Sequence, residues 1–478
     1  STSIMDGEVY ATNVSLSGNA DATFNGNVKI TAGLSVTDGV LNFGEDTVVD
    51  LAHINISILG SGTINFYGTV DITGAELIMG AGKMNFYGKT IGGVVKLNEG
   101  NPSVTYDETA FASLWNDVVN DTVEEVFGTM NVTKADLDFN GKIGLDTDNA
   151  IADLNIGDVE ISTDLTVHKD VYAANVNFLN PDAELSFAED NLTIYGNLVA
   201  GADGYGIVDA TAKSATITGT IGAEGLAIQK IDIGADKTVT ANSDVYAGQI
   251  IFGGANATFV AGNATSIYAD AVTLVDNTGD IVTNSNLNFE GKIGTSIAAL
   301  NQIKIADSST FTANQDVYTT SVYFGDTDST LVLAGADNTT SIVDVIDPAH
   351  ANSQGILQFT ASGTNTVKAT FGTEDNSFAQ LDALSESGTL VFDSESGTQY
   401  FTAVKLAANT GTTLVFDGGA NIHDQLTFTD NDQVVEFGAN TTLTNGADFN
   451  GTKGTITLDA SLGNATLDGA ATTSANTT

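Results

Sequence analysis

Paired carboxylates in loop-like segments are the residues of this sequence best suited to chemistry. Three Asp-x-Asp pairs stand in the motifs DTDN, DTDS and DND: Asp146 and Asp148, Asp326 and Asp328, Asp430 and Asp432. Oxygen ligands at positions i and i+2 of a loop are typical of Ca²⁺ sites. None of the pairs continues into an EF-hand loop, and the G-G-x-G-x-D repeat of calcium β-rolls is absent. The sequence therefore predicts Ca²⁺ as a candidate cofactor at these six residues, with ordinary solvated turns as the alternative.

The other reactive residue types form no catalytic pattern. The four histidines are scattered, and the sequence has no H-E-x-x-H, no G-x-S-x-G and no phosphate-binding loop. β-Helical enzymes that act on polysaccharides usually combine carboxylates with arginine or lysine, and this chain has no arginine. We therefore predict that it is not an enzyme and has no catalytic residues, and keep a polysaccharide-acting enzyme as the least favoured alternative.

The charge balance excludes several partners. Sixty acidic residues face fifteen basic ones, all lysine, for a net charge of −45. Nucleic acids and anionic membrane surfaces both require a basic face, so neither is expected as a partner. The acidity is explained by solubility and resistance to nonspecific binding. The alternative is divalent-cation binding, because copies of so acidic a chain repel one another unless counter-ions bridge them. Cysteine is absent, and no apolar run is long enough to predict a transmembrane span.

Two nested repeats predict the elements that position these residues. The phrase V-Y-x-x-x-V-x-F recurs with Tyr172, Tyr246 and Tyr318 spaced 74 and 72 residues apart, and FNGKIG, ITGTIG and FEGKIG follow the same register. Within this long repeat lies a shorter one: Phe43, Phe66 and Phe86 are 23 and 20 residues apart. Such spacings are typical of stacked units rather than a closed core.

Short strands fill the shorter repeat. Runs of four to six residues alternate apolar and polar side chains, and Gly, Asn, Asp and Thr separate them. About three runs fit between successive phenylalanines, which predicts a three-sided coil and about three coils per long repeat. The phenylalanines should form an internal column, while Tyr67 and Tyr87 should face outward or sit at a corner. The predicted fold class is all-β, an elongated right-handed parallel β-helix (β-solenoid).

One segment departs from the strand pattern. From Tyr106 to Phe127 the apolar residues follow a helical period, which predicts one short helical insertion. Its stripe includes Phe111, Trp115 and Val118, our candidates for an interface between subunits, although a helix that simply docks on the solenoid explains them too. The predicted sections are residues 1–100 (N-terminal solenoid), 101–135 (helical insertion), 136–340 (solenoid repeats) and 341–478 (C-terminal solenoid with a frayed tail).

These motifs carry a family resemblance. The alternation of G-K-I-G, an L-x-x-I-x-I phrase near Leu154 and Leu300, and V-Y-A-x-x-V-x-F resembles the passenger repeats of rickettsial-type outer-membrane proteins A and B, and more broadly autotransporter passengers. The resemblance covers most of residues 1–340. It implies a secreted β-solenoid held at the cell surface, acting as an adhesin or a self-assembling coat. No C-terminal outer-membrane barrel follows, so it implies a processed passenger or another route of release.

The sequence favours two functions. The first is an extracellular structural protein that self-assembles into a cell-surface layer (S-layer) or filament, a homopolymer whose copies meet through solenoid ends and flanks. The second is an adhesin that binds cell-surface glycans or a host receptor. Both predict a secreted or cell-surface location.

Overall fold

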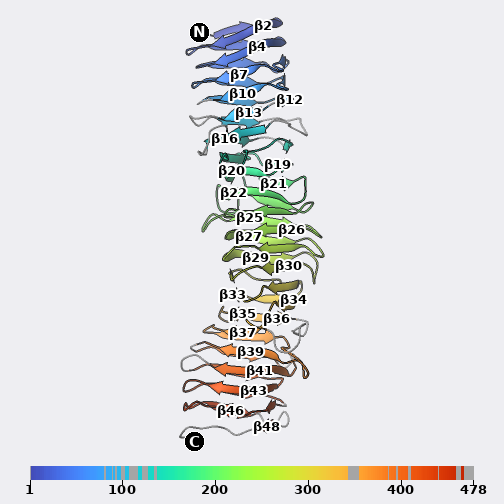
Figure 1. The fold of residues 1–478 in the computed structure, drawn as a ribbon, viewed down its shortest axis with the longest axis vertical. Coiled ribbons are helices and arrows are strands. Elements are labelled where there is room, and N and C mark those ends of the chain that lie inside the picture. The colour runs from blue at the N-terminus through green and yellow to red at the C-terminus, as the bar shows by residue number, and fades with distance from the viewer. Residues whose placement is uncertain are drawn as a thin grey trace. The chain divides into compact units, whose positions relative to one another are not determined.

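The computed structural model confirms an all-β solenoid. It describes residues 2–79, 82–88, 90–91, 94–97, 103–106, 117–120, 127–133, 137–342, 355–385, 387–393, 397–406, 411–439, 441–458 and 465–467. The chain divides into two compact units, residues 1–232 with 241–248 (unit 1) and residues 233–240 with 249–478 (unit 2). In each unit the described strands stack in parallel, and the two units together hold about 18 turns (Figure 1).

Unit 1 contains three rows of parallel strands. The first row is β1 (Thr2–Met5), β3 (Asp21–Phe24), β5 (Val40–Phe43), β8 (Thr63–Phe66), β11 (Lys83–Phe86), β14 (Ser103–Tyr106), β16 (Phe127–Val132), β18 (Ile151–Ile156), β20 (Val171–Phe178), β22 (Leu192–Ala200) and β24 (Ala215–Ile217). A second is β2 (Val9–Leu16), β4 (Val28–Val36), β6 (Val48–Asp50), β7 (Asn55–Ile58), β9 (Thr69–Asp71), β10 (Glu76–Met79), β12 (Thr90–Ile91), β13 (Val94–Leu97) and β15 (Asp117–Asn120). A third is β17 (Leu137–Phe139), β19 (Asp164–Val167), β21 (Glu184–Phe187) and β23 (Ile207–Ala210).

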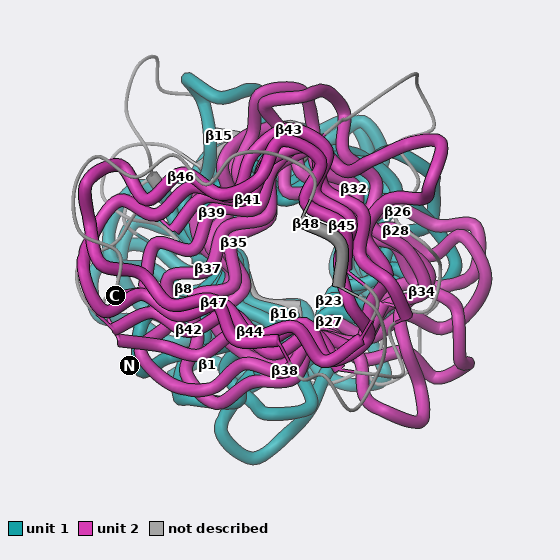
Figure 2. The backbone as a smooth tube through the Cα atoms, turned by 90° about the horizontal axis from the view of Figure 1, so that it is seen from below, with its two compact units in different colours: residues 1–232, 241–248 teal, residues 233–240, 249–478 magenta. Residues whose placement is uncertain are grey.

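The predicted three-strand turn is found in unit 1. Strand β4 pairs through its first half with β6 and through its second half with β7, so two sides of the coil branch from one long strand. The next turn then runs β5, β6, β7 and returns to β8, which pairs in register with β5. Viewed from below, the backbone of each unit winds around a closed interior (Figure 2), which apolar side chains fill.

Unit 2 contains two rows of parallel strands. One is β28 (Thr258–Ala261), β30 (Asp280–Thr283), β32 (Leu300–Ile305), β34 (Val317–Phe324), β36 (Thr339–Ile342), β38 (Thr364–Lys368), β40 (Thr389–Phe392), β42 (Thr413–Phe416), β44 (Val434–Phe437) and β47 (Thr455–Leu458). The other is β29 (Ser266–Thr273), β31 (Leu287–Phe289), β33 (Thr310–Ala313), β35 (Thr330–Leu333), β37 (Ile356–Phe359), β39 (Phe378–Ala383), β41 (Gln399–Leu406), β43 (Ala420–Phe428), β45 (Thr441–Leu443), β46 (Ala447–Asp448) and β48 (Ala465–Leu467). The chain passes between the units within β25 (Ile228–Ile233), β26 (Thr238–Ala241) and β27 (Val245–Phe252).

Stacked phenylalanines form the interior column that the spacing predicts. In unit 1 the ring centroids of Phe43 and Phe66 lie 5.0 Å apart with planes 2° from parallel, and those of Phe66 and Phe86 lie 5.3 Å apart at 11°. All three side chains are fully buried. A parallel, in-register ladder places equivalent residues directly over one another, so a phenylalanine in each turn produces a continuous stack.

The predicted helical insertion is not found among the described residues, which contain no helix. Residues 107–116 and 121–126 lie outside the described part of the chain. Between them, Asp117–Asn120 forms strand β15, which pairs in parallel with β13. The run Asp-Val-Val-Asn suits a strand because β-branched residues fit a pleated ladder, and pairing with the preceding turn overrides the helical spacing there.

Candidate functional site

The predicted calcium pair at Asp146 and Asp148 lies in a local turn of unit 1. Asp146 Oδ1 accepts hydrogen bonds from the backbone N–H of Asp148 (3.0 Å) and of Asn149 (2.9 Å), and from Asn149 Nδ2 (2.9 Å). This is an Asx turn, in which the carboxylate satisfies its own loop. One oxygen of the pair is therefore already taken by protein donors.

The pair at Asp326 and Asp328 is more tightly engaged, in unit 2. Asp326 accepts from the backbone N–H of Ser308 (2.9 Å) and of Asp328 (3.1 Å), and from the hydroxyls of Ser329 and Ser308 (2.9 Å each). These donors, led by the backbone N–H of Ser308, lower the pKa of Asp326 from 3.8 to about 2. The carboxylate ties one turn to the next.

The third pair also belongs to a turn. Asp430 Oδ1 accepts from the backbone N–H of Asn431 (2.7 Å), and Asp432 adopts a positive φ of 61°. Across the described residues, no three or more His, Asp or Glu side chains come together in a group that could hold a metal ion. Calcium binding at the six aspartates therefore stays a prediction, and each pair has a structural role in its turn.

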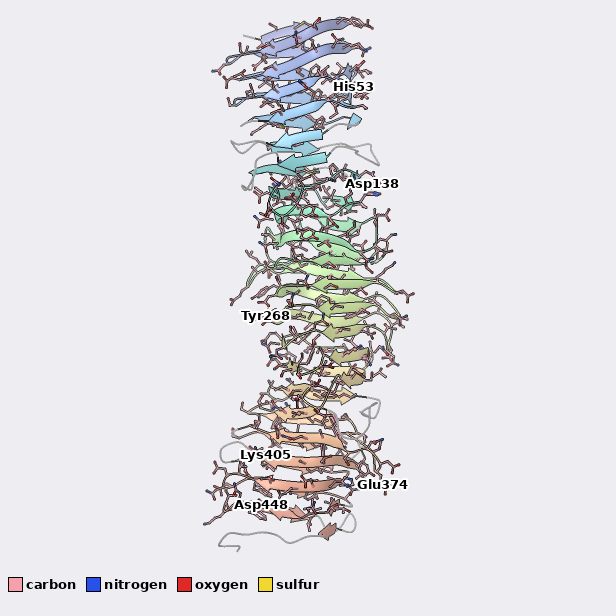
Figure 3. All side chains as sticks on the ribbon, viewed as in Figure 1. His53, Asp138, Tyr268, Glu374, Lys405 and Asp448 are labelled. Atoms are coloured by element: carbon pink, nitrogen blue, oxygen red, sulfur yellow. The ribbon has the colours of Figure 1, made fainter. Side chains whose placement is uncertain are left out.

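Of the three predicted interface residues, the structure describes only Val118, and of Val118 only the backbone. Phe111 and Trp115 lie outside the described residues, and Val118 belongs to strand β15, whose side chains are likewise not described. In unit 2, Lys405 and Asp448 lie on one side of the view and Glu374 on the other (Figure 3).

Columns of asparagine run along the outer side of unit 1. Asn65 Nδ2 donates to Asn42 Oδ1 (2.8 Å), and Asn85 Nδ2 donates to Asn65 Oδ1 (2.7 Å). Each of these residues precedes a phenylalanine of the interior column, so the Asn-Phe dipeptide places an amide outside and a ring inside. The repeated NF in LNFG, INFYG and MNFYG carried this signal, but only its phenylalanines entered the sequence prediction.

A second asparagine column follows further along unit 1. Asn155 Nδ2 donates to Asn131 Oδ1 (2.7 Å), and Asn177 Nδ2 donates to Asn155 Oδ1 (2.8 Å). In unit 2, Asn314 Nδ2 donates to Asn288 Oδ1 (2.7 Å). An amide carries both donor and acceptor, so a stack of identical amides satisfies itself from turn to turn.

Charged side chains also lie in register between turns of unit 1, where their charges shift the pKa of carboxylates. Asp50 lies in register with Asp71 of the next turn, and Lys29 Nζ contacts Asp50 Oδ2 at 2.5 Å, which lowers the pKa of Asp50. Glu184 lies in register with Asp164. Burial, with the added charges of Asp164 and Asp209, raises the pKa of Glu184.

A shallow depression lies on the outer face of unit 2. Its volume is about 360 Å³, and its lining is Thr265, Asn286, Leu287, Asn288, Thr310 and Thr312. The lining holds hydroxyl and amide groups but no charged side chain. Such a surface can form hydrogen bonds with a neutral polar ligand, and the volume is at the low end for ligand pockets.

Two neighbouring loops of unit 2 present apolar side chains to solvent. Asp276 Oδ1 accepts from the backbone N–H of Ala299 (2.8 Å), and the N–H of Asn277 donates to the carbonyl of Ala299 (2.9 Å). These bonds hold together a pair of loops in which Leu274 is 70% exposed and Ile297 is 88% exposed.

Comparison with known proteins adds no relative: no family model, no curated protein and no solved structure matches the chain. The described part of the chain contains no helix with the length and apolar character needed to cross a membrane.

Proposed function

We propose that this chain is an extracellular structural protein that self-assembles into a cell-surface layer or filament, with copies meeting through the ends and flanks of the solenoid. The asparagine columns carry this proposal. In Asn42, Asn65 and Asn85 the outward amides bond to one another across turns at 2.7–2.8 Å. Outward amides that bond to one another between turns stabilise the solenoid and leave few polar groups to bind or convert a substrate.

The charge of the chain supports cation-dependent assembly. A net charge of −45 makes copies repel one another at low ionic strength. Divalent cations relieve that repulsion by binding carboxylates from two copies, and the exposed aspartate turns, such as Asp146 and Asp148, provide oxygen ligands for them. Assembly should therefore require Ca²⁺ or Mg²⁺ and should reverse with a chelator.

The exposed loops of unit 2 offer a flank contact between copies. Burying a large apolar side chain completely is worth about 1.5–3 kcal/mol. Leu274 and Ile297 lie on loops joined through Asp276 and Ala299, so they would be buried together rather than one by one. Every copy in a polymer would make this contact, so a modest free-energy gain per contact adds up over the assembly.

Sedimentation velocity in Ca²⁺ over a concentration series tests both statements. The wild-type chain should form large species that dissociate in EDTA, and the double variant Leu274→Ser, Ile297→Ser should need a several-fold higher concentration to do so. The matched control is Val159→Ser, which alters an 82% exposed side chain of unit 1 and should assemble like the wild type. A wild-type chain that stays monomeric rejects self-assembly, whereas a double variant that behaves as the wild type rejects this flank contact alone.

An adhesin is the second candidate, and the depression on unit 2 favours it. Its threonine and asparagine lining is uncharged, which suits a neutral glycan better than an acidic one on so negative a chain. Binding of the purified chain to immobilised neutral oligosaccharides, lost in Thr312→Val, would support this function over a purely structural one.

A further inference from the structure

Two pairs of tyrosines stack between adjacent turns of unit 1. The ring centroids of Tyr67 and Tyr87 lie 4.7 Å apart with planes 7° from parallel. Those of Tyr172 and Tyr195 lie 4.6 Å apart at 3°. The two residues of the second pair are direct partners in the β20–β22 register. The ladder thus holds phenol rings face to face in both pairs.

These stacks differ from the phenylalanine column beside them in exposure and reactivity. Phe66 and Phe86 are fully buried, whereas the neighbouring Tyr67 is 39% exposed. A phenol can lose one electron and one proton to become a phenoxyl radical, which a benzyl ring does not do under mild conditions. The Tyr67–Tyr87 pair therefore combines an oxidisable group, access from solvent and a second identical group at van der Waals distance.

We propose that Tyr67 and Tyr87 are a modification site, at which oxidative coupling joins two adjacent turns of the solenoid through a dityrosine cross-link. The oxidant is hydrogen peroxide acting through a peroxidase. Each phenol gives up one electron and one proton, and the two radicals form a carbon–carbon bond between ring positions ortho to the hydroxyls. Each coupled carbon then loses its hydrogen as a proton, and each ring oxygen regains one. The protein loses two hydrogen atoms in total, and one hydrogen peroxide becomes two waters.

The fold favours this coupling over competing reactions. A phenoxyl radical on a free chain meets another one only by diffusion, whereas groups held in place react at very high effective concentration. Backbone pairing of β8 with β11 in register fixes the position of both tyrosines, since each directly follows the paired Phe66 and Phe86. Coupling requires one ring to slide and tilt out of the parallel stack, so that an ortho carbon of each ring comes within bonding distance of the other.

Treatment of the dilute, intact chain with a peroxidase and hydrogen peroxide tests the proposal. We expect dityrosine fluorescence within monomeric chains, and peptides joined through Tyr67 and Tyr87 with a mass two hydrogen atoms below their sum. Tyr87→Phe keeps the stacked ring but removes the second phenol, so the linked peptide and its share of the dityrosine fluorescence should be lost, as with Tyr67→Phe. The matched control Tyr10→Phe removes a 76% exposed tyrosine and should leave the link unchanged.

Other results would overturn the proposal. If the wild type yields no peptide joined through Tyr67 and Tyr87, the proposal fails. If the linked peptides mainly involve Tyr10 or two different chains, exposure rather than stacking governs the reaction. The outcome does not depend on whether copies of the chain assemble, because the link forms within one chain.

Discussion

Asn65 donates a hydrogen bond of 2.8 Å to Asn42 on the preceding turn and accepts one of 2.7 Å from Asn85 on the next. Asn65 is only 8% exposed, whereas Asn42 and Asn85 are half-buried. Replacement by alanine leaves an acceptor on Asn42 and a donor on Asn85 without this partner.

Asn65→Ala should therefore destabilise unit 1. Each lost hydrogen bond is worth about 0.5–1.5 kcal/mol, since water can still reach the half-buried amides of Asn42 and Asn85. Denaturant unfolding measures the change in the free energy of unfolding, and hydrogen exchange of the amides of β8 and β11 shows where in unit 1 it arises. The control Asn19→Ala changes an exposed loop asparagine and should stay within about 0.5 kcal/mol of the wild type; equal losses in both variants would contradict a special role for the column.

Phe66→Ala should be more damaging, because Phe66 is fully buried between Phe43 and Phe86. Truncation of a buried phenylalanine costs about 3–5 kcal/mol through lost transfer energy and the cavity that remains. Phe66→Leu should cost less, since it fills most of the volume. Thermal unfolding of the three proteins should rank wild type, Phe66→Leu and Phe66→Ala in falling order; an Ala variant as stable as the Leu variant would argue against a close-packed column.

The internal phenylalanines were also the part of the fold most fully predictable from sequence. Spacings of 23 and 20 residues placed Phe43, Phe66 and Phe86 in one column, and the near-parallel rings confirm it. The 39% exposure of Tyr67 agrees with the prediction that it faces outward or sits at a corner. Both follow from the period-two alternation of strands, which is local and readable in the sequence.

Features that depend on pairing between turns were less predictable. Asn65 reads as a turn residue until its register with Asn42 is known, because asparagine is common in turns. Val118 fits both a helical stripe and a strand, and only pairing with β13 decides for the strand. An Asp-x-Asp pair is equally a metal site or an Asx turn in sequence; Asp326 turns out to accept hydrogen bonds from Ser308 of the preceding turn, 18 residues earlier.

The lowered pKa of Asp326 predicts that its contribution to folding stability depends on pH. Its pKa is lowered from 3.8 to about 2, so the ionised form is favoured by folding. Its contribution is present above pH 3.8 and is lost as the pH falls through about 2. Asp326→Asn should therefore lower stability at pH 7, and the gap to the wild type should close at the acid end. Unfolding curves from pH 7 to pH 2 measure that gap, and a gap independent of pH would contradict the assignment.

Glu184 gives the opposite dependence. Burial beside Asp164 and Asp209 raises its pKa above the ordinary value of 4.5, so folding favours the protonated form. Its favourable contribution is complete below that ordinary value and is lost as the pH rises through the higher, folded-state pKa. Glu184→Gln mimics the protonated group and should stabilise unit 1 at pH 7 but change little at pH 4. Denaturant midpoints at the two pH values check this, with Glu189→Gln as an exposed control; a destabilised Gln variant at pH 7 would refute it.

Negative-stain imaging of the purified chain, at physiological ionic strength with Ca²⁺ and again with EDTA, tests self-assembly most directly. We expect ordered sheets or filaments in Ca²⁺ and separate particles in EDTA. Separate particles in both conditions, at every concentration up to the solubility limit, would contradict it.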